Sequence, residues 1–335
     1  MLEITEAILT KNLCDGKIQC RVCNKNCIIN PNDRGDCQVR ENKDGILYAL
    51  NYGQVSSASS DPIEKKPLYH FQPGTETYSI GSIGCNFECP FCQNWNISFA
   101  DIKKFPTKKI TPEELIELAK NNLCKSISFT YNEPGIWLEY ILDVMELSQK
   151  EDLKIILVTN GYQSQEALEL LIPNLDAVNI DLKGDLEFYK TLSNAKRTPV
   201  LKTIKKLNDA GIHIEITNLI IPGYNDSEEI LRDLIQSIYD IDPEIPIHFT
   251  RFFPNYKLMN SPPTPMETLE SAKKLAQESG LKYIYIGNVP FADNNTYCPE
   301  CNELIVDRSS FNTNEVTLDE NNKCPKCGYE INIKV

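Results

Sequence analysis

The chain has 335 residues, of which 41% are hydrophobic and 24% charged, a globular composition with room for one large core and small appendages. Acidic residues outnumber basic ones by 47 to 34, which disfavours nonspecific binding to a nucleic-acid backbone. The N-terminal residues lack the pattern of a signal peptide, and no apolar run approaches the roughly 20 residues that span a bilayer. We therefore expect a cytoplasmic protein without a membrane segment.

The chain contains 13 cysteines, which in a reducing compartment indicate metal or redox chemistry rather than disulfides. Most of them fall into an N-terminal group of four, a central group of three and a C-terminal group of four: Cys20, Cys23, Cys27 and Cys37; Cys85, Cys89 and Cys92; and Cys298, Cys301, Cys324 and Cys327. Cys14 and Cys124 remain. We assign them no metal, and we interpret Cys124 as a small buried hydrophobic residue because it precedes an apolar run.

The N-terminal group lies in the run CRVCNKNCIINPNDRGDC (20–37). Pro31 and Gly35 supply the turn that can bring Cys37 back toward the other three cysteines, so that one site can close. The spacing leaves two candidates open for this site, zinc and a second iron–sulfur cluster.

The segment DPIEKKPLYHF (61–71) follows this group. Its Lys65, Lys66 and His70 either belong to a charged, solvated linker or cover the mouth of the next domain and meet a substrate there.

Strand-like and helix-like segments alternate through the middle of the chain. The predicted strands are 76–84, 126–131, 154–161, 177–184, 212–223, 245–254 and 283–289. The predicted helices are 111–122, 135–150, 165–172, 199–210, 227–240 and 267–280. About six repeats of strand and helix favour a parallel sheet with right-handed crossovers. About 210 residues are fewer than the ~250 of a full eightfold barrel, which leaves a partial barrel or an open doubly wound sheet.

The loops after these strands carry the residues of chemical interest. In chain order they read GCNFECPFCQNW (84–95), YNEP (131–134), TNG (159–161), DLKG (181–184), IPGYND (221–226) and RFFPNYK (251–257). Because the carboxyl ends of parallel strands meet at one edge of the sheet, we expect these six loops to form one pocket.

The central loop has three cysteines in a C-x3-C-x2-C run. Three thiolates can bind three irons of a [4Fe–4S] cluster and leave the fourth iron open, as catalytic metal sites leave a position open. Gly84 lets the chain turn tightly into the loop, and Phe87, Phe91 and Trp95 would shield the cluster. The alternatives are a zinc knuckle with a distant fourth ligand and a redox-active pair, which would leave one of the three cysteines unexplained.

The run CNFECPFC resembles the signature of the radical S-adenosylmethionine (SAM) superfamily. The resemblance implies a partial (β/α)6 barrel, a [4Fe–4S] cluster on the three cysteines, and SAM chelating the open iron. Electron transfer would then cleave SAM to methionine and a 5′-deoxyadenosyl radical, which abstracts hydrogen from a protein or small-molecule substrate.

The resemblance also implies which residues surround SAM. They are Phe91, Gln93, Tyr131, Asn132, Glu133, Thr159, Asn160, Asp181, Leu182, Lys183 and Phe253. Glu133 matches the acid of a Gly-Gly-Glu motif whose glycines are here Tyr131 and Asn132. Phe253 stands where related activases carry a histidine, so we expect ring stacking there.

No catalytic side chain is expected beyond the cofactor ligands, because the cofactors carry the chemistry. The sequence has no recognisable Ser-His-Asp triad and no G-x4-G-K-[ST] loop. We interpret His248 as a core histidine.

CPEC (298–301) and CPKC (324–327) are typical of a zinc ribbon with a β-hairpin between the two knuckles. Rubredoxin-like iron is the alternative. The chain is thus expected to comprise an N-terminal four-cysteine module and linker (1–72), a radical SAM core (73–292) and a zinc ribbon (293–335).

Taken in order, the motifs resemble the radical SAM member of the AmmeMemoRadiSam system, which is related to pyruvate formate-lyase activating enzymes. That resemblance implies Memo-type and AMME-candidate-type partners and a low-potential electron donor, a ferredoxin or flavodoxin. A glycyl-radical activase, an RNA-modifying radical SAM enzyme and a noncatalytic metal-binding scaffold remain as alternatives. The net charge of -13 argues against the RNA-modifying enzyme.

Overall fold

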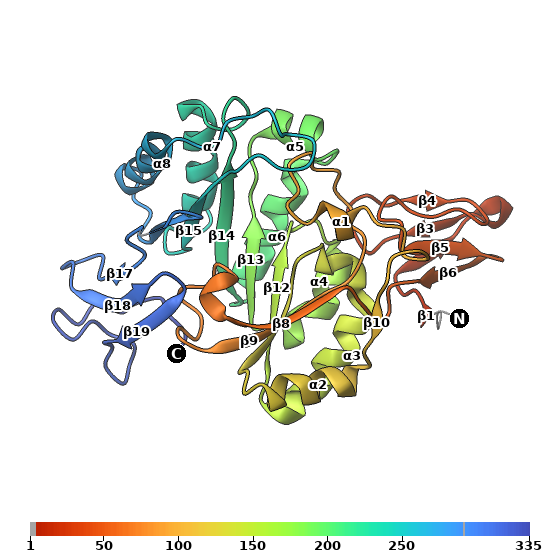
Figure 1. Cartoon of the computed structure of the whole chain (residues 1–335), viewed down its shortest axis with the longest axis horizontal. Coiled ribbons are helices and arrows are strands. Elements are labelled where there is room, and N and C mark those ends of the chain that lie inside the picture. Colours follow the sequence, from red (N-terminus) through yellow and green to blue (C-terminus); the bar gives the residue numbers. More distant parts are fainter. Residues whose placement is uncertain (1–4, 291) are drawn as a thin grey trace.

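The computed structural model describes residues 5–290 and 292–335 (Figure 1). Its centre is an eight-stranded sheet in the order β16-β15-β14-β13-β12-β11-β9-β8. These strands are β8 (Ser57–Pro62), β9 (Glu76–Gly81), β11 (Ser126–Phe129), β12 (Lys154–Thr159), β13 (Ala177–Asp181), β14 (His213–Ile220), β15 (Ile247–Arg251) and β16 (Ile284–Gly287). From β9 to β16 neighbouring strands run parallel, which confirms the predicted parallel sheet.

The sheet is not closed, since no pairing joins β16 to β8 in the described residues. β8 was not predicted: residues 57–62 fell within the expected N-terminal module and linker, yet they pair antiparallel with β9 along its whole length. The central sheet therefore begins before residue 73. The curvature of a partial barrel stays a prediction.

Helices connect the strands of this sheet. They are α1 (Trp95–Ser98), α2 (Pro112–Asn121), α3 (Leu138–Ser148), α4 (Gln165–Leu171), α5 (Leu186–Leu192), α6 (Arg197–Asp209), α7 (Glu228–Tyr239) and α8 (Met266–Glu278). The predicted start of α2 is confirmed by a capping box, in which the Thr111 hydroxyl accepts from the Glu114 N–H and the Glu114 carboxylate accepts from the Thr111 N–H. α1 and α5 were not predicted; both are short. In the described residues no helix combines the length and apolarity needed to cross a membrane.

One face of the sheet is apolar and packs on the helices, as Ile127 and Phe129 of β11 do. Because side chains alternate along a strand, Ser126 and Ser128 point to the other face, which is polar although buried. On that face the Ser128 hydroxyl bonds the Thr77 hydroxyl of β9 at 2.7 Å.

Glu215 of β14 lies on the polar face and is fully buried. It contacts the three histidines of the chain: it accepts from the His70 backbone N–H (2.7 Å) and lies 3.1 Å and 2.7 Å from the ring nitrogens of His213 and His248. Burial opposes ionisation of Glu215, yet the two imidazoles hold its pKa well below its usual range. His248 is thus a core residue, as predicted.

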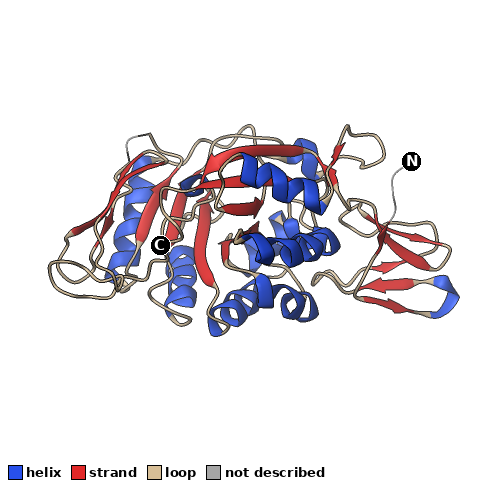
Figure 2. Cartoon of the chain, turned by 90° about the horizontal axis from the view of Figure 1, so that it is seen from below, coloured by secondary structure: helices blue, strands red, loops and turns tan. Residues whose placement is uncertain are grey.

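Two small cysteine-rich parts flank the central sheet on opposite sides (Figure 1). The N-terminal part has two three-stranded sheets, β1-β6-β5 and β2-β3-β4, and its β7 pairs with β10. These strands are β1 (Thr5–Glu6), β2 (Thr10–Asn12), β3 (Ile18–Cys20), β4 (Ile28–Ile29), β5 (Arg40–Lys43), β6 (Ile46–Ala49), β7 (Gln54–Val55) and β10 (Lys108–Lys109). Figure 2 places the N-terminal strands at one end of the molecule, beyond the helices.

The C-terminal part forms the sheet β17-β18-β19, with β17 (Thr296–Tyr297), β18 (Leu304–Ser309) and β19 (Asn312–Val316). β18 and β19 are the hairpin expected between the two cysteine knuckles.

The C-terminal part is tied to the segment just before β9. Phe71 and Lys334 form a parallel bridge, the Lys334 N–H donates to the His70 carbonyl (2.8 Å), and the Gln72 N–H donates to the Lys334 carbonyl (2.6 Å). His70 also lies between this part and β16, since one ring nitrogen bonds the Asn332 carbonyl (2.7 Å) and the other the Tyr285 hydroxyl (2.6 Å). His70 and Lys66 are buried, so a solvated linker is wrong for both.

Candidate functional site

The three central cysteines open onto a cavity of about 360 Å³ at the carboxyl ends of the parallel strands. A cavity of this size falls in the usual range for small-molecule sites. Of the predicted site residues its lining includes Cys85, Cys89, Cys92, Phe91, Gln93, Tyr131, Asn132, Glu133, Thr159, Asn160, Asp181 and Lys183. Loops separated by up to about a hundred residues therefore meet at one place, as the parallel topology predicts.

Leu182 and Phe253 do not line this cavity. Leu182 is fully buried in the hydrophobic core, because the strand alternation turns it away from its neighbours Asp181 and Lys183. Phe253 is 43% exposed, and its ring packs under the Arg251 guanidinium with 5.1 Å between the guanidinium carbon and the ring centroid. The expected stacking of Phe253 in the cavity is thus not seen.

The fifth and sixth loops, 221–226 and 251–257, do not line the cavity. Strand residues line it instead, together with other residues that sequence analysis missed: Pro67, Asn94, Ser98, Phe99, Val158, Thr217, Leu219, Thr250 and Asn288. Lys65 also lines it, which favours the interpretation that this segment covers the mouth. The period-2 pattern of β14 and β15 could have indicated Thr217, Leu219 and Thr250, which alternate with core residues.

Each central thiol has a polar neighbour. The Phe87 N–H donates to the Cys85 sulfur (3.4 Å), and the Ser193 hydroxyl lies 3.4 Å from the Cys89 sulfur. Burial raises the pKa of both thiols. Thiolates at this depth therefore need cationic compensation, which a bound metal cluster supplies.

Lys183 is a cation that acts electrostatically on two of these thiols, those of Cys89 and Cys92. Its ammonium lies 2.7 Å from the Asp181 carboxylate and 5.8 Å from the centre of the Phe91 ring. Burial would lower the pKa of Lys183, but Asp181 and the Cys89 thiolate raise it above its ordinary value. The lysine is therefore charged, and its charge offsets part of the rise that burial causes in the pKa of Cys89 and Cys92.

Glu133 joins the loops after β11 and β12. Its Oε1 accepts from the Gly135 N–H and the Thr159 hydroxyl, both at 2.7 Å, and from the Gln163 amide at 3.2 Å. Its Oε2 accepts from the Asn160 N–H, at 2.7 Å, and from no other donor in the part of the chain that the structure describes. Burial raises the pKa of Glu133 to about 7, although these hydrogen bonds favour the charged form. A carboxylate oxygen with one donor keeps a lone pair free, so Oε2 can accept from a ligand ammonium group.

The two residues before Glu133 support the cysteine loop. The Asn132 amide accepts from the Ser82 N–H (3.0 Å) and donates to the Gly84 carbonyl (2.9 Å), and the Asn94 amide donates to the Tyr131 carbonyl (2.7 Å). Tyr131 has a φ of +70°, a left-handed conformation that glycine adopts without strain. The tyrosine thus keeps a glycine-like backbone and adds a ring over the ammonium of Lys66, 5.3 Å from the ring centroid.

Aromatic side chains flank the outer edge of the cysteine loop. Trp95 stacks on Tyr256 with 5.2 Å between ring centroids, and Phe99, which lines the cavity, lies 5.4 Å from the same ring. Phe87 and Phe91 are buried as expected, but Trp95 is 44% exposed and does not line the cavity. Trp95 therefore closes the loop against the segment around Tyr256 and does not shield a cluster.

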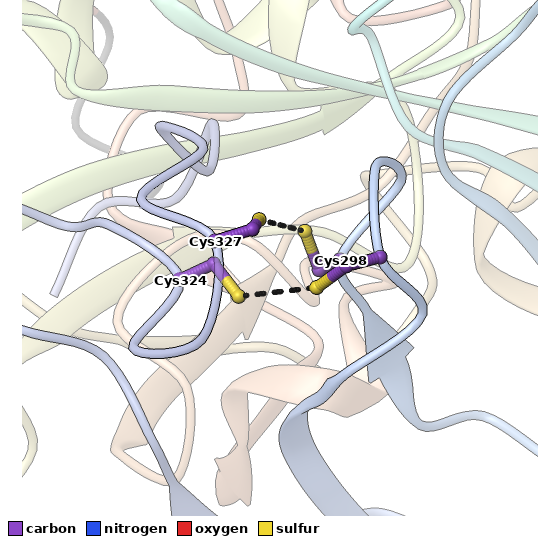
Figure 3. Close-up of side chains that lie close together, drawn as sticks. Cys298, Cys324 and Cys327 are labelled. Carbon is purple, nitrogen blue, oxygen red and sulfur yellow. Dashed lines mark hydrogen bonds between the residues drawn. The ribbon is translucent and has the colours of Figure 1, made fainter.

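The C-terminal cysteines form a second site (Figure 3). Cys298 and Cys327 have their sulfurs 3.6 Å apart, as do Cys301 and Cys324, and all four sulfurs lie within 4.8 Å of one another. Four sulfurs about 2.3 Å from one ion stand about 3.8 Å apart, so this group fits a single tetrahedral ion.

The N-terminal cysteines surround a small cavity next to the central loop. Its lining includes Cys20, Cys23, Cys27 and Cys37 together with Asn86, which directly follows Cys85. Burial raises the pKa of Cys37 to about 12 and that of Cys27 to about 11. Cys124 is buried in the core, as interpreted, and Cys14 is exposed.

Comparison with known proteins agrees with this geometry. The family description "Radical SAM superfamily" matches residues 79–235. An uncharacterized protein of Methanocaldococcus jannaschii is 46% identical over 98% of this chain and 99% of its own length. The pyruvate formate-lyase 1-activating enzyme of Escherichia coli is 22% identical over 60% of this chain and 89% of its own length.

A further curated relative and a solved structure are also similar to this chain. The pyruvate formate-lyase-activating enzyme of Clostridium pasteurianum is 26% identical over 47% of this chain and 67% of its own length. Among solved structures, a radical SAM methyltransferase from Sphaerobacter thermophilus covers 67% of this chain and 71% of its own, with 14% identity and a TM-score of 0.49. The chain therefore contains a radical SAM domain over residues 79–235 and is homologous to pyruvate formate-lyase activating enzymes.

Proposed function

We propose that this protein binds a [4Fe–4S] cluster through Cys85, Cys89 and Cys92 and binds SAM in the adjacent cavity. The observation that carries the proposal is the donor set of that cavity: its lining includes these three cysteines but no fourth cysteine and no histidine. A cluster held there keeps one iron free for a ligand. When bound, the cluster and SAM supply reductive cleavage of SAM to methionine and a 5′-deoxyadenosyl radical.

The protein's own groups orient SAM and exclude water. Glu133 Oε2 would accept a hydrogen bond from the amino group of SAM, because Gly135, Thr159 and Asn160 already hold the carboxylate in place. Phe99 and the Tyr256 segment cover the outer edge of the cysteine loop and keep water away from a reactive intermediate.

Homology to pyruvate formate-lyase activating enzymes favours a glycyl-radical protein as substrate, so that the enzyme would act as an activase. The order of motifs favours the AmmeMemoRadiSam system, with Memo-type and AMME-candidate-type partners and a ferredoxin or flavodoxin as electron donor. We further propose zinc at the C-terminal site, because the 3.6 Å sulfur spacing suits a single tetrahedral ion.

Anaerobic reconstitution followed by metal analysis and product detection tests the proposal. The protein should gain about four irons that depend on Cys85, Cys89 and Cys92, and with SAM and dithionite it should release 5′-deoxyadenosine. A Cys89→Ser variant should lose both, whereas Cys14→Ser, a change at an exposed cysteine, should lose neither. A wild-type protein that holds zinc alone and leaves SAM intact contradicts the proposal. Electron paramagnetic resonance of candidate glycyl-radical proteins, incubated with the loaded enzyme and SAM, decides the activase question.

A further inference from the structure

The four N-terminal cysteines form a buried, enclosed site. Cys20, Cys23 and Cys37 are each less than a tenth exposed and Cys27 is half-buried. A knuckle turn shapes the site, in which the Asn26 N–H donates to the Cys23 carbonyl (3.1 Å) and the Cys20 N–H donates to the Cys27 carbonyl (2.9 Å). Together the four side chains line a void of about 10 Å³, room for roughly one water-sized sphere.

The spacing of these thiols differs from that of the C-terminal four. Within residues 5–290 and 292–335, one group of Cys, His, Asp or Glu side chains has all its ligand atoms within 4.8 Å of one another. This group is the C-terminal four cysteines. Neither the N-terminal four nor the central three meets that spacing. Sulfurs about 2.3 Å from one zinc ion stand about 3.8 Å apart, whereas an iron–sulfur cluster spreads its ligands around a larger body. The N-terminal thiols are therefore spaced more widely than one tetrahedral ion requires, as are the central three.

Arg40 points to an anion in the same place. Its guanidinium is 2% exposed, lines the void, and is held by Glu139 through bonds of 2.6 Å and 2.7 Å. Its Nε–H has no hydrogen-bond partner among the described residues. A buried donor without a partner is costly, and a thiolate or sulfide of a bound cluster would accept from it.

The N-terminal site lies directly behind the central cysteine loop. The Cys37 carbonyl oxygen would lie only 2.5 Å from a Cβ on Gly84, so it touches the backbone just before Cys85. Asn86, just after Cys85, lines the N-terminal void, and its side-chain oxygen accepts from Asn160, which lines the central cavity (2.7 Å). One loop of three residues, 84–86, therefore separates the two groups of thiols.

A second connection fixes this arrangement. Cys23 and Gln163 form an isolated antiparallel β-bridge. On either side of it, the Asn24 N–H donates to the Tyr162 carbonyl (2.9 Å) and the Ser164 N–H donates to the Val22 carbonyl (3.1 Å). These bonds join the N-terminal knuckle to the chain just after Thr159 and Asn160 of the central cavity. The distance between the two sites is thus set from two sides.

We propose that Cys20, Cys23, Cys27 and Cys37 bind a second iron–sulfur cluster that passes an electron to the central one. Electronic coupling falls steeply with distance, so centres separated by one short loop exchange electrons quickly. A low-potential one-electron donor of the ferredoxin or flavodoxin class reduces the N-terminal cluster by one electron near half-buried Cys27, and the same electron then reduces the central cluster. The relay forms and breaks no bond. The electron relay rests on the central cluster of the proposed function. The assignment of an iron–sulfur cluster to the N-terminal cysteines does not depend on it.

Metal content separates the two proposals. The anaerobically reconstituted wild type should hold about six to eight irons, and the triple variant Cys85→Ser, Cys89→Ser, Cys92→Ser should keep about two to four. The triple variant leaves the N-terminal site intact, so its iron and visible absorption report on that site alone. A wild type with four irons and two zinc ions, and a triple variant without iron, would overturn the second cluster while leaving the proposed function in place. Iron bound at the N-terminal site alone would refute the central cluster, and with it the proposed function, while supporting the second cluster.

Electron paramagnetic resonance tests the relay. In the dithionite-reduced wild type, two paramagnetic clusters this close should broaden each other's signals through spin coupling, and Cys37→Ser should restore the narrow signal of the central cluster. Cys14→Ser serves as the control for a cysteine outside the sites. Two uncoupled signals in the wild type would refute electron exchange through the 84–86 loop, even with both clusters present.

Discussion

Replacing Gly84 by alanine tests the contact between the N-terminal part and the central cysteine loop. Gly84 has a φ of +92°, and an added Cβ would lie 2.5 Å from the Cys37 carbonyl oxygen and 2.9 Å from Val39 Cγ1. Gly45 is a matched control, because its φ is +81° but nothing lies within 4 Å of its Cβ position. Both variants carry the backbone strain, and only Gly84→Ala carries the clash.

The two costs can be estimated separately. A left-handed conformation costs an alanine about 1–2 kcal/mol relative to glycine, which is the whole effect expected for Gly45→Ala. Overpacking against a fixed backbone oxygen adds about 1–3 kcal/mol or more, so Gly84→Ala should lose about 2–5 kcal/mol. At roughly 2–4 °C per kcal/mol, the melting temperature of Gly84→Ala should fall clearly below that of Gly45→Ala.

Thermal unfolding of both variants, with iron content after reconstitution, is the measurement. Gly84→Ala should also bind less iron, because the clash displaces Cys37 or the residue next to Cys85, whereas Gly45→Ala should bind as much as the wild type. Equal melting temperatures and equal iron content in the two variants would show that Cys37 does not rest on the central loop.

Three further results are expected. Burial lowers the pKa of His70 from 6.5 to about 3, so the folded state keeps the imidazole neutral. The contribution of His70 to stability is therefore complete above pH 6.5 and is lost as the pH falls toward 3. The free energy of unfolding should fall by roughly 2 kcal/mol between about pH 6.5 and about pH 5. Denaturant unfolding that gives the same free energy at pH 7 and pH 5 would contradict this. Glu133→Gln should weaken SAM binding to the cluster-loaded protein about 10- to 100-fold by calorimetry, the value of one charge-assisted hydrogen bond, while Glu187→Gln on the surface of α5 should not. Cys324→Ser should lose one metal ion per chain and leave the iron content unchanged, and loss of iron from this variant would refute the separation of the sites.

The parallel core was predictable because its strands and helices carry strong local patterns. The cysteine loop and Glu133 could be placed in one cavity, since parallel strands bring their carboxyl ends together. β8 was missed because SASSDP has the composition of a turn; only its pairing with β9 makes it a strand. The family resemblance wrongly placed Leu182 in the cavity. Side chains alternate along a strand, and this rule, applied to the sequence, would have directed the Leu182 side chain into the core.

The buried polar contacts around the sheet could not be predicted from residue types. Glu215 appears in the sequence as an acid within an apolar strand, and nothing local indicates that three histidines from separate segments surround it. Likewise, Lys66 and Asp61 lie in a charged stretch that suggests exposure to solvent. Both are buried beneath Tyr131, where the Lys66 ammonium lies 2.9 Å from the Asp61 carboxylate. The burial of these groups depends on distant segments that pack over them, which a single sequence does not specify.

The bridge between Phe71 and Lys334 has a consequence for biosynthesis. These residues are far apart in the chain, so during translation the segment before β9 stays without its partner until residue 334 has left the ribosome. The central cysteines and their N-terminal neighbours are synthesised long before that moment. The contact between the C-terminal part and the segment before β9 is therefore among the last in the chain that can form.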